Sequence, residues 1–315
     1  MSRDVPVSLW CEEAADAQTL SEADDGEELR TPARAETPAP GPCEVPAAWD
    51  PAVLGHRAVQ RLLQLEQRYA PSLLYVGLMQ SEPQRREQLV KFAMEVCSDR
   101  GCEEQVFPLS VSLLDRFLSA SLSVPAAPLG LMAACVLVAS KLSECDTLPV
   151  DTLCAAAEYG FSSTSLREME RVVVATLHWD MASVTPQDFL PHFLSAALSS
   201  PSATLRRHAD TLAALCVCDA RFLGAPPSLL AAGALCCALK GLGTHGPLEL
   251  GLVTERLAHL CQSDPAVLQC CAEMIELVLR ERLSGGLQSA PSEKEEELTE
   301  PPRPGTPADM TEIDF

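Results

Sequence analysis

The chain has 315 residues and a formal net charge of −21, from 44 acidic and 23 basic side chains. This balance argues against a DNA-binding protein, because neutralising phosphates requires a basic surface. Hydrophobic residues make up 47% of the chain, which is enough for compact cores, but aromatic residues make up only 4%. Cores built mainly from Leu, Ala, Val and Cys favour helices over sheets.

The negative charge is concentrated at the two ends of the chain. Residues 1–50 carry −9 and residues 286–315 carry −6, which leaves −6 for residues 51–285. The two ends also hold 11 of the 25 prolines. Segments of this composition cannot bury enough apolar surface to offset their conformational entropy. We therefore predict a disordered acidic arm and a disordered acidic tail on either side of a helical core.

The composition also bears on compartment, metals and catalysis. The first residues lack the order of a secretion signal, and no two of the 14 cysteines have Cys-x-x-Cys spacing, so we expect reduced, buried cysteines and no metal site. No apolar run reaches the roughly 18–20 residues that span a bilayer, so no membrane association is expected. We find no phosphate-binding Gly loop and no nucleophile beside a base, so we expect no cofactor and no catalytic site.

The core shows helical periodicity almost throughout, interrupted by clusters of Gly, Pro and Ser. The pattern predicts amphipathic helices at residues 56–69, 84–97 and 107–119. The stretch 129–142 is apolar on every face, so we expect a central helix surrounded by others. A second helix of this kind is predicted at residues 229–239.

The two central segments superpose with a constant offset of 98 residues, and each follows an amphipathic helix and a loop that contains proline. This pattern indicates two related all-helical modules, at residues 51–183 and 184–285. Thr185 is predicted to cap the first helix of the second module, with Pro186 at its first position and Asp188 in its first turn.

A series of short motifs runs through the core in order: LeuAspArgPheLeu (114–118), AlaSerLys (139–141), MetGlu (169–170), LeuHisTrpAsp (177–180), ThrProGlnAspPheLeu (185–190) and ProProSerLeuLeuAlaAlaGlyAla (226–234). In order and spacing these motifs resemble the cyclin box, and the D-type cyclins in particular. The resemblance covers about residues 55–283 and implies an all-α fold of two tandem five-helix cyclin-box bundles.

The resemblance implies a non-catalytic regulatory subunit that binds and activates a cyclin-dependent kinase of the 4/6 class in G1/S progression, in nucleus and cytoplasm. Lys141 and Glu170 match the family's kinase-binding pair, and Leu142 and Glu144 follow beside them. An arbitrary Lys and Glu would be solvated surface charges. Here the resemblance favours a kinase contact.

The acidic arm contains Leu9, Cys11 and Glu13 in a Leu-x-Cys-x-Glu string. Apolar residues in such a segment are better explained by partner binding than by burial in a fold. The resemblance implies docking to retinoblastoma-family pocket proteins. In the acidic tail, Thr306 precedes a proline; either the tail is an inert linker or, as the resemblance implies, phosphorylation of Thr306 leads to recognition by a ubiquitin ligase.

The sequence departs from the family at the docking patch for substrates and Cip/Kip-type inhibitors. Many cyclins have Met-Arg-x-x-Leu-x-x-Trp there, whereas this chain has Arg85, Arg86, Leu89 and Phe92. The patch is assigned to Arg86, Leu89 and Phe92, and inhibitor binding stays open. Two other classes of protein are alternatives: a cyclin-fold transcription factor would need a basic surface, and a helical scaffold would need at least three repeats.

Overall fold

The computed structural model describes residues 56–121, 127–144, 147–198, 202–243 and 246–287. These residues form helices and the turns between them, and within these ranges there is no strand. The all-α prediction is therefore confirmed. No helix in the described ranges combines the length and apolar character needed to cross a membrane.

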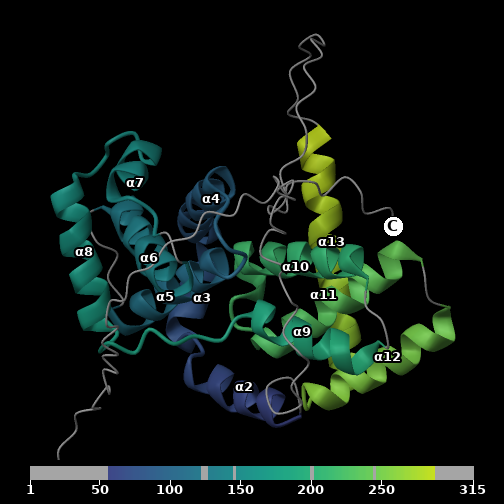
Figure 1. Ribbon diagram of the computed structural model, residues 1–315. Coiled ribbons are helices and arrows are strands. Elements are labelled where there is room, and N and C mark those ends of the chain that lie inside the picture. Colours follow the sequence, from purple (N-terminus) through teal and green to yellow (C-terminus); the bar gives the residue numbers. More distant parts are fainter. Residues whose placement is uncertain (1–55, 122–126, 145–146, 199–201, 244–245, 288–315) are drawn as a thin grey trace, which may run out of the picture. The chain divides into compact units, whose positions relative to one another are not determined.

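Two groups of five α-helices, which we call the first and second lobes, follow a pair of leading helices (Figure 1). The leading helices are α2 (His56–Arg68) and α3 (Leu73–Ser81). The first lobe contains α4 (Pro83–Arg100), α5 (Val106–Ser121), α6 (Pro128–Ser143), α7 (Val150–Ala156) and α8 (Ser163–Thr176). The second contains α9 (Pro186–Ala197), α10 (Ala203–Cys218), the 3₁₀ turn η1 (Ala220–Phe222), α11 (Pro227–Leu242), α12 (Pro247–Leu260) and α13 (Pro265–Leu287).

Local sequence signals determine where many of these helices begin and end. The side chains of Ser72, Ser162 and Ser202 accept hydrogen bonds from the first turns of α3, α8 and α10. At α9, the Asp188 carboxylate accepts the Thr185 backbone N–H at 2.7 Å, so α9 begins at the predicted cap. These caps satisfy backbone groups that have no partner within the helix.

Each lobe is built around one helix that is buried on all sides. In α6 every residue from Gly130 to Ser140 is buried, and the helix packs against α4, α5 and α8. In α11 the residues from Leu230 to Leu239 are buried, and the helix packs against α9, α10, α12 and α13. Figure 1 shows both arrangements. The two apolar stretches of the sequence are therefore central helices, as predicted.

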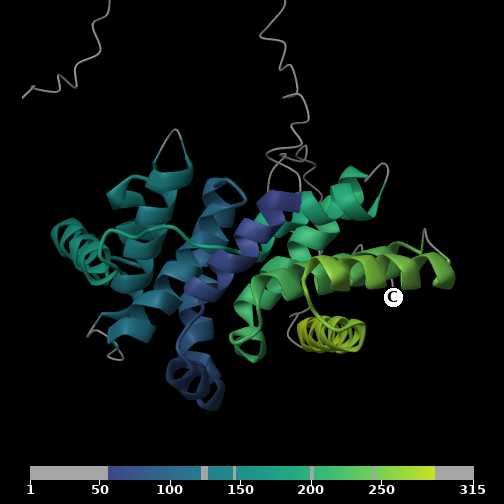
Figure 2. The same ribbon diagram turned by 90° about the horizontal axis from the view of Figure 1, so that it is seen from below.

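Helix α2 packs on the second lobe although it precedes the first lobe in the chain. Its buried residues Val59 and Leu63 belong to the core of the second lobe. The Glu66 carboxylate accepts the Ser228 backbone N–H and hydroxyl, both at 2.9 Å, at the start of α11. Figure 2 shows α2, in purple, beside the green helices of the second lobe. Residues 51–183 thus contain a helix whose packing surface belongs to the other lobe.

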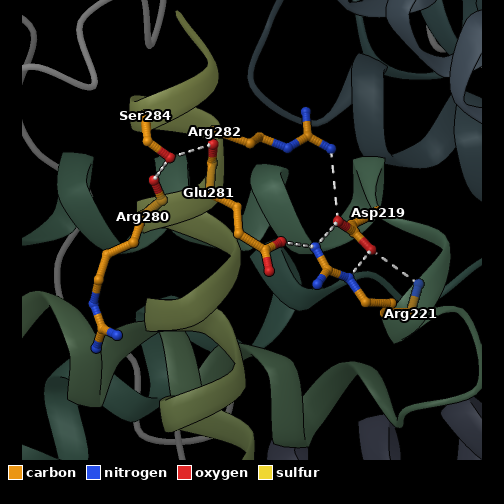
Figure 3. Close-up of polar contacts among 6 residues, drawn as sticks. All are labelled: Asp219, Arg221, Arg280, Glu281, Arg282 and Ser284. Carbon is orange, nitrogen blue, oxygen red and sulfur yellow. Dashed lines mark hydrogen bonds and ion pairs between the residues drawn. The ribbon is translucent and has the colours of Figure 1, made fainter. Parts of the chain in front are cut away.

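A charged cluster joins α13 to the turn after α10 (Figure 3). Asp219 is buried and accepts Arg221 Nε at 3.0 Å, while Arg221 Nη2 donates to Glu281 at 2.8 Å. Arg282 Nη2 lies 3.8 Å from Asp219 Oδ2. Burial alone would raise the pKa of Asp219, but the hydrogen bonds from Arg221 and the charge of Arg282 lower it overall. The cluster therefore ties the long last helix to the turn that follows α10.

Candidate functional site

The fold brings Lys141 and Glu170 together, although 29 positions separate them in the chain. Lys141 is in the last turn of α6 and Glu170 is in the middle of α8. The Lys141 ammonium forms an ion pair with Glu170 Oε1, and the Lys141 side chain is 46% exposed. Because α6 is buried up to Ser140, Lys141 is the position where this helix reaches the surface. The pair is accessible and has a fixed place at the rim of the core.

Glu144 lies close to this pair along the chain but has internal hydrogen-bond partners. Its two carboxylate oxygens accept the Ser140 hydroxyl at 2.8 Å and the Glu103 backbone N–H at 3.0 Å. The Ser140 hydroxyl in turn accepts the Leu148 backbone N–H at 2.8 Å. Glu144 thus fastens the end of α6 to the turn between α4 and α5. It supports the shape of the surface beside Lys141.

An exposed apolar side chain follows each member of the ion pair along the chain. Leu142, next to Lys141, is 55% exposed, and Trp179, just beyond α8, is 83% exposed. The Trp179 backbone N–H donates to the Val174 carbonyl, one helical turn beyond Glu170. His178 and Trp179 both have positive φ, a strained conformation for residues with a Cβ. The structure thus holds a large aromatic side chain in solvent at the end of the helix that carries Glu170.

Trp179 was not among the predicted site residues. Its signal in the sequence is the rarity of tryptophan, with three in the whole chain, inside one of the recognised motifs. A buried Trp would have fitted that motif equally well, since aromatic residues usually lie in cores. Only the tertiary structure shows that the ring is exposed, at a turn where residues 178 and 179 both have positive φ.

The residues predicted to form a docking patch on α4 lie beneath its surface. Arg86 is 3% exposed, and its guanidinium donates to both oxygens of Asp115, at 2.9 and 2.8 Å. Leu89 and Phe92 are also buried, at 6% and 9% exposed. Arg86 therefore acts inside the fold, because a guanidinium held by two hydrogen bonds beneath the surface is not available to a ligand. Binding at the neighbouring surface of α4 stays a prediction.

The remaining predicted residues lie outside the described ranges. These are Leu9, Cys11 and Glu13 in the arm and Thr306 in the tail. Over the described ranges, no group of three or more His, Cys, Asp or Glu side chains is arranged to hold a metal ion.

Comparison with known proteins identifies the two lobes. Residues 57–182 match the N-terminal cyclin domain, and residues 184–297 match the C-terminal cyclin domain. The chain is 35% identical to the G1/S-specific cyclin-D1 of Danio rerio over 284 residues, covering 87% of this chain and 98% of that protein. It is 38% identical to the G1/S-specific cyclin-D3 of Bos taurus over 275 residues, covering 84% and 94%.

A solved structure has the same fold. The viral cyclin from herpesvirus saimiri superposes with a TM-score of 0.59 at 22% identity, covering 73% of this chain and 97% of that one. At this identity the likeness concerns the fold, and the sequence relatives carry the assignment to a family.

Proposed function

This chain belongs to the cyclin family and to its D-type branch, and we propose that it is the regulatory subunit that binds and activates a cyclin-dependent kinase of the 4/6 class. The relatives are named as G1/S-specific cyclins, and we extend that stage of the cell cycle to this chain. In this role the chain performs no catalysis, and the kinase carries out phosphoryl transfer.

The observation that carries this proposal is the Lys141–Glu170 pair. The family resemblance selects these two residues, and the fold places them side by side where the central helix of the first lobe reaches the surface. Exposed Leu142 lies next to Lys141 in α6, and exposed Trp179 lies just beyond the end of α8. A charged pair with apolar neighbours suits a protein partner that supplies backbone hydrogen bonds and covers the apolar groups.

The proposed mechanism is positional. Binding at this surface would hold the regulatory helix of the kinase inward, so that the helix Glu pairs with the Lys that orients ATP. The first lobe suits this task because α6 is packed on all sides, and a closely packed interior resists deformation. Activation then arises from the differential affinity of the rigid surface for the inward conformation of the kinase.

Reversing the charge at Lys141 tests this interface. In Lys141→Glu, two carboxylates would face each other at the rim of α6, and we expect the variant to lose co-purification with the kinase and to keep its helix content by circular dichroism. Lys91→Glu is the matched control, since Lys91 is exposed on α4 and is paired with Glu95 at 3.7 Å. Kinase binding by Lys141→Glu at the level of Lys91→Glu would rule out this surface.

We also propose that the acidic arm directs the kinase to retinoblastoma-family proteins through Leu9, Cys11 and Glu13. The support is the Leu-x-Cys-x-Glu string in a segment whose composition disfavours a core. Leu9→Ala combined with Cys11→Ala should reduce phosphorylation of a retinoblastoma fragment about tenfold or more in a kinase assay. Activity on a short peptide that lacks the pocket should stay unchanged. Equal loss on both substrates would contradict a docking role.

The tail has a separate proposed role. Thr306 followed by proline suits phosphorylation and later recognition by a ubiquitin ligase, with the protein moving between nucleus and cytoplasm. Binding of Cip/Kip-type inhibitors belongs to the same set of proposals. It would have to use exposed positions of α4, because Arg86 is buried.

A further inference from the structure

The turn between α4 and α5 brings two cysteines into contact. Helix α4 ends at Arg100, and Gly101 follows in the left-handed region with φ 61°. The Cys102 backbone N–H then donates to the Cys97 carbonyl at 3.0 Å. This bond closes a helix end in which the residue after the glycine and the residue five positions earlier commonly touch through their side chains. Here both of those residues are cysteines.

The backbone geometry places the two cysteines within reach of a disulfide. From Cys102 Cα to Cys97 Cα the path runs through the N–Cα bond of Cys102, the 3.0 Å hydrogen bond, and the C=O and C–Cα bonds of Cys97. These lengths sum to about 7 Å for a straight path, and the bends at the atoms along the path make the Cα–Cα distance shorter. Disulfides usually join Cα atoms about 4.4–6.8 Å apart. A helix end of this kind commonly brings these two side chains into contact, and both cysteines are free thiols.

The surroundings of the pair differ from those of the deeply buried cysteines. Cys97 and Cys102 are 6% and 8% exposed, and the turn that covers them, from Ser98 to Gly101, is exposed. Cys135, in the centre of the same lobe, is 0% exposed, and burial raises the pKa of its thiol. Cys97 and Cys102 thus flank an exposed surface turn, whereas Cys135 lies in the centre of the core.

The electrostatic setting supports reactivity at Cys102. The hydrogen bond from Cys97 lowers the pKa of the Cys102 thiol, because it stabilises the thiolate, while burial and the nearby Glu144 carboxylate act in the opposite direction. The thiolate is the form that attacks oxidants. Cys97 is the neighbouring thiol that can resolve the product.

We propose that Cys97 and Cys102 are a modification site at which a hydroperoxide forms a reversible disulfide. The Cys102 thiolate attacks one peroxide oxygen, the O–O bond breaks, and the leaving oxygen takes up a proton. Cys97 sulfur then attacks the sulfenic sulfur, the S–O bond breaks, and water leaves. The two thiols lose two electrons and two protons, and hydrogen peroxide is reduced to two molecules of water. A dithiol reductant restores both thiols by exchange.

The simpler alternative is that both cysteines act only as small apolar side chains that fill the helix end. A bound metal is not the explanation, since the described residues contain no group of three suitable ligands. The two explanations differ in one measurable outcome. A merely apolar pair yields no Cys97–Cys102 cross-link at a peroxide dose that leaves the deep cysteines reduced.

Peptide mapping of the full chain tests the proposal directly. The reduced protein is treated with graded hydrogen peroxide, blocked with an alkylating reagent, denatured and digested with trypsin. Cleavage after Lys91, Arg100 and Arg116 separates the cysteines into peptides 92–100 and 101–116. We expect these peptides to appear joined, to separate after dithiothreitol, and to join at a dose at which Cys135 is still alkylated. Separate peptides at every dose, whether alkylated or singly oxidised, would overturn the proposal.

Two variants make the test specific. Cys97→Ser should abolish the joined peptides and leave Cys102 to oxidise further, whereas Cys135→Ala should leave the cross-link unchanged. Circular dichroism checks that each variant keeps its helix content. The map of the unmodified chain decides the question even where a variant folds poorly. Neither result depends on kinase binding, so failure here leaves the proposed function untouched.

Discussion

The Arg86 guanidinium connects three helices. It pairs with Asp115 of α5, and its Nη1 donates to the Cys218 carbonyl at the end of α10 at 3.4 Å. The Tyr75 hydroxyl donates to the same Asp115 carboxylate at 2.7 Å. Burial, with the adjacent Asp115 charge, raises the pKa of Tyr75, so the phenol stays a donor. All the groups in this network are buried, so the loss of any one leaves another buried polar group without a hydrogen-bond partner.

Arg86→Ala should lower the free energy of unfolding by about 3–5 kcal/mol, because it leaves a buried carboxylate without its cation. Arg85→Ala is the matched control. Arg85 is exposed and pairs with Glu82 at 2.7 Å on the surface, so its loss should change the free energy by less than about 1 kcal/mol. Denaturant titrations followed by circular dichroism measure both. Equal effects of the two substitutions would show that the Asp115 carboxylate finds another partner.

At the scale of elements, α6 and α11 occupy corresponding places in the two lobes and end in the same way. Each is buried along its length and has a lysine in its last turn, Lys141 or Lys240. Lys240 pairs with the buried Glu276 of α13 at 2.6 Å, as Lys141 pairs with Glu170 of α8. A cation at a helix C-terminus is favourable in both cases. The difference is that Glu276 is also bonded to Arg280 at 3.0 Å.

The contact of α11 with α13 depends on a glycine. A Cβ at Gly233 would lie 3.0 Å from Ile275 Cδ1 and 3.1 Å from Cys271 Sγ. Gly233→Ala should therefore destabilise the chain by about 1–3 kcal/mol through overpacking. In α12, Gly251→Ala should instead stabilise it by about 0.5–1 kcal/mol, because nothing lies within 4 Å and alanine favours a helix. Thermal unfolding compares them, and a stabilising Gly233→Ala would contradict the packing argument.

At the scale of the whole molecule, two separate cores are joined by polar contacts and by α2. Arg206 of α10 lies 3.7 Å from Glu104, which follows α4, and 3.6 Å from Asp210 on its own helix. Asp210 is mostly buried, and its pKa is raised to about 6. The largest cause is burial, the charge of Glu104 adds to it, and Arg206 acts in the opposite direction. Two carboxylates thus share one arginine where the lobes meet.

This arrangement makes stability depend on pH. The folded state holds the Asp210 proton more tightly than the unfolded state, so this contribution is fully present below pH 3.8 and is lost as pH rises through about 6. The Asn side chain does not titrate. In Asp210→Asn, the free energy of unfolding should therefore fall by about 1–3 kcal/mol less between pH 4 and pH 7 than in the unmodified chain. Denaturant titrations across that range, with exposed Asp99→Asn as control, measure it. Parallel pH profiles for Asp210→Asn and the unmodified chain would refute the assignment.

Sequence alone was sufficient for the local features of this protein. Helical periodicity, the Thr185 cap, the two fully apolar helices and the ordered motifs depend on residues a few positions apart. The same local order gave the family resemblance, which the related proteins confirm. It also pointed to Lys141 and Glu170, which the fold then brought together.

Tertiary structure alone decided which side chains face inward and which distant residues meet. It buried Arg86 against Asp115, turned Trp179 outward, packed α2 on the second core and set Asp210 beside Glu104. The physical reason is that periodicity marks an apolar face but carries no information about the helix that will cover it. A polar residue on such a face becomes a buried partner or an exposed contact only when two helices cross.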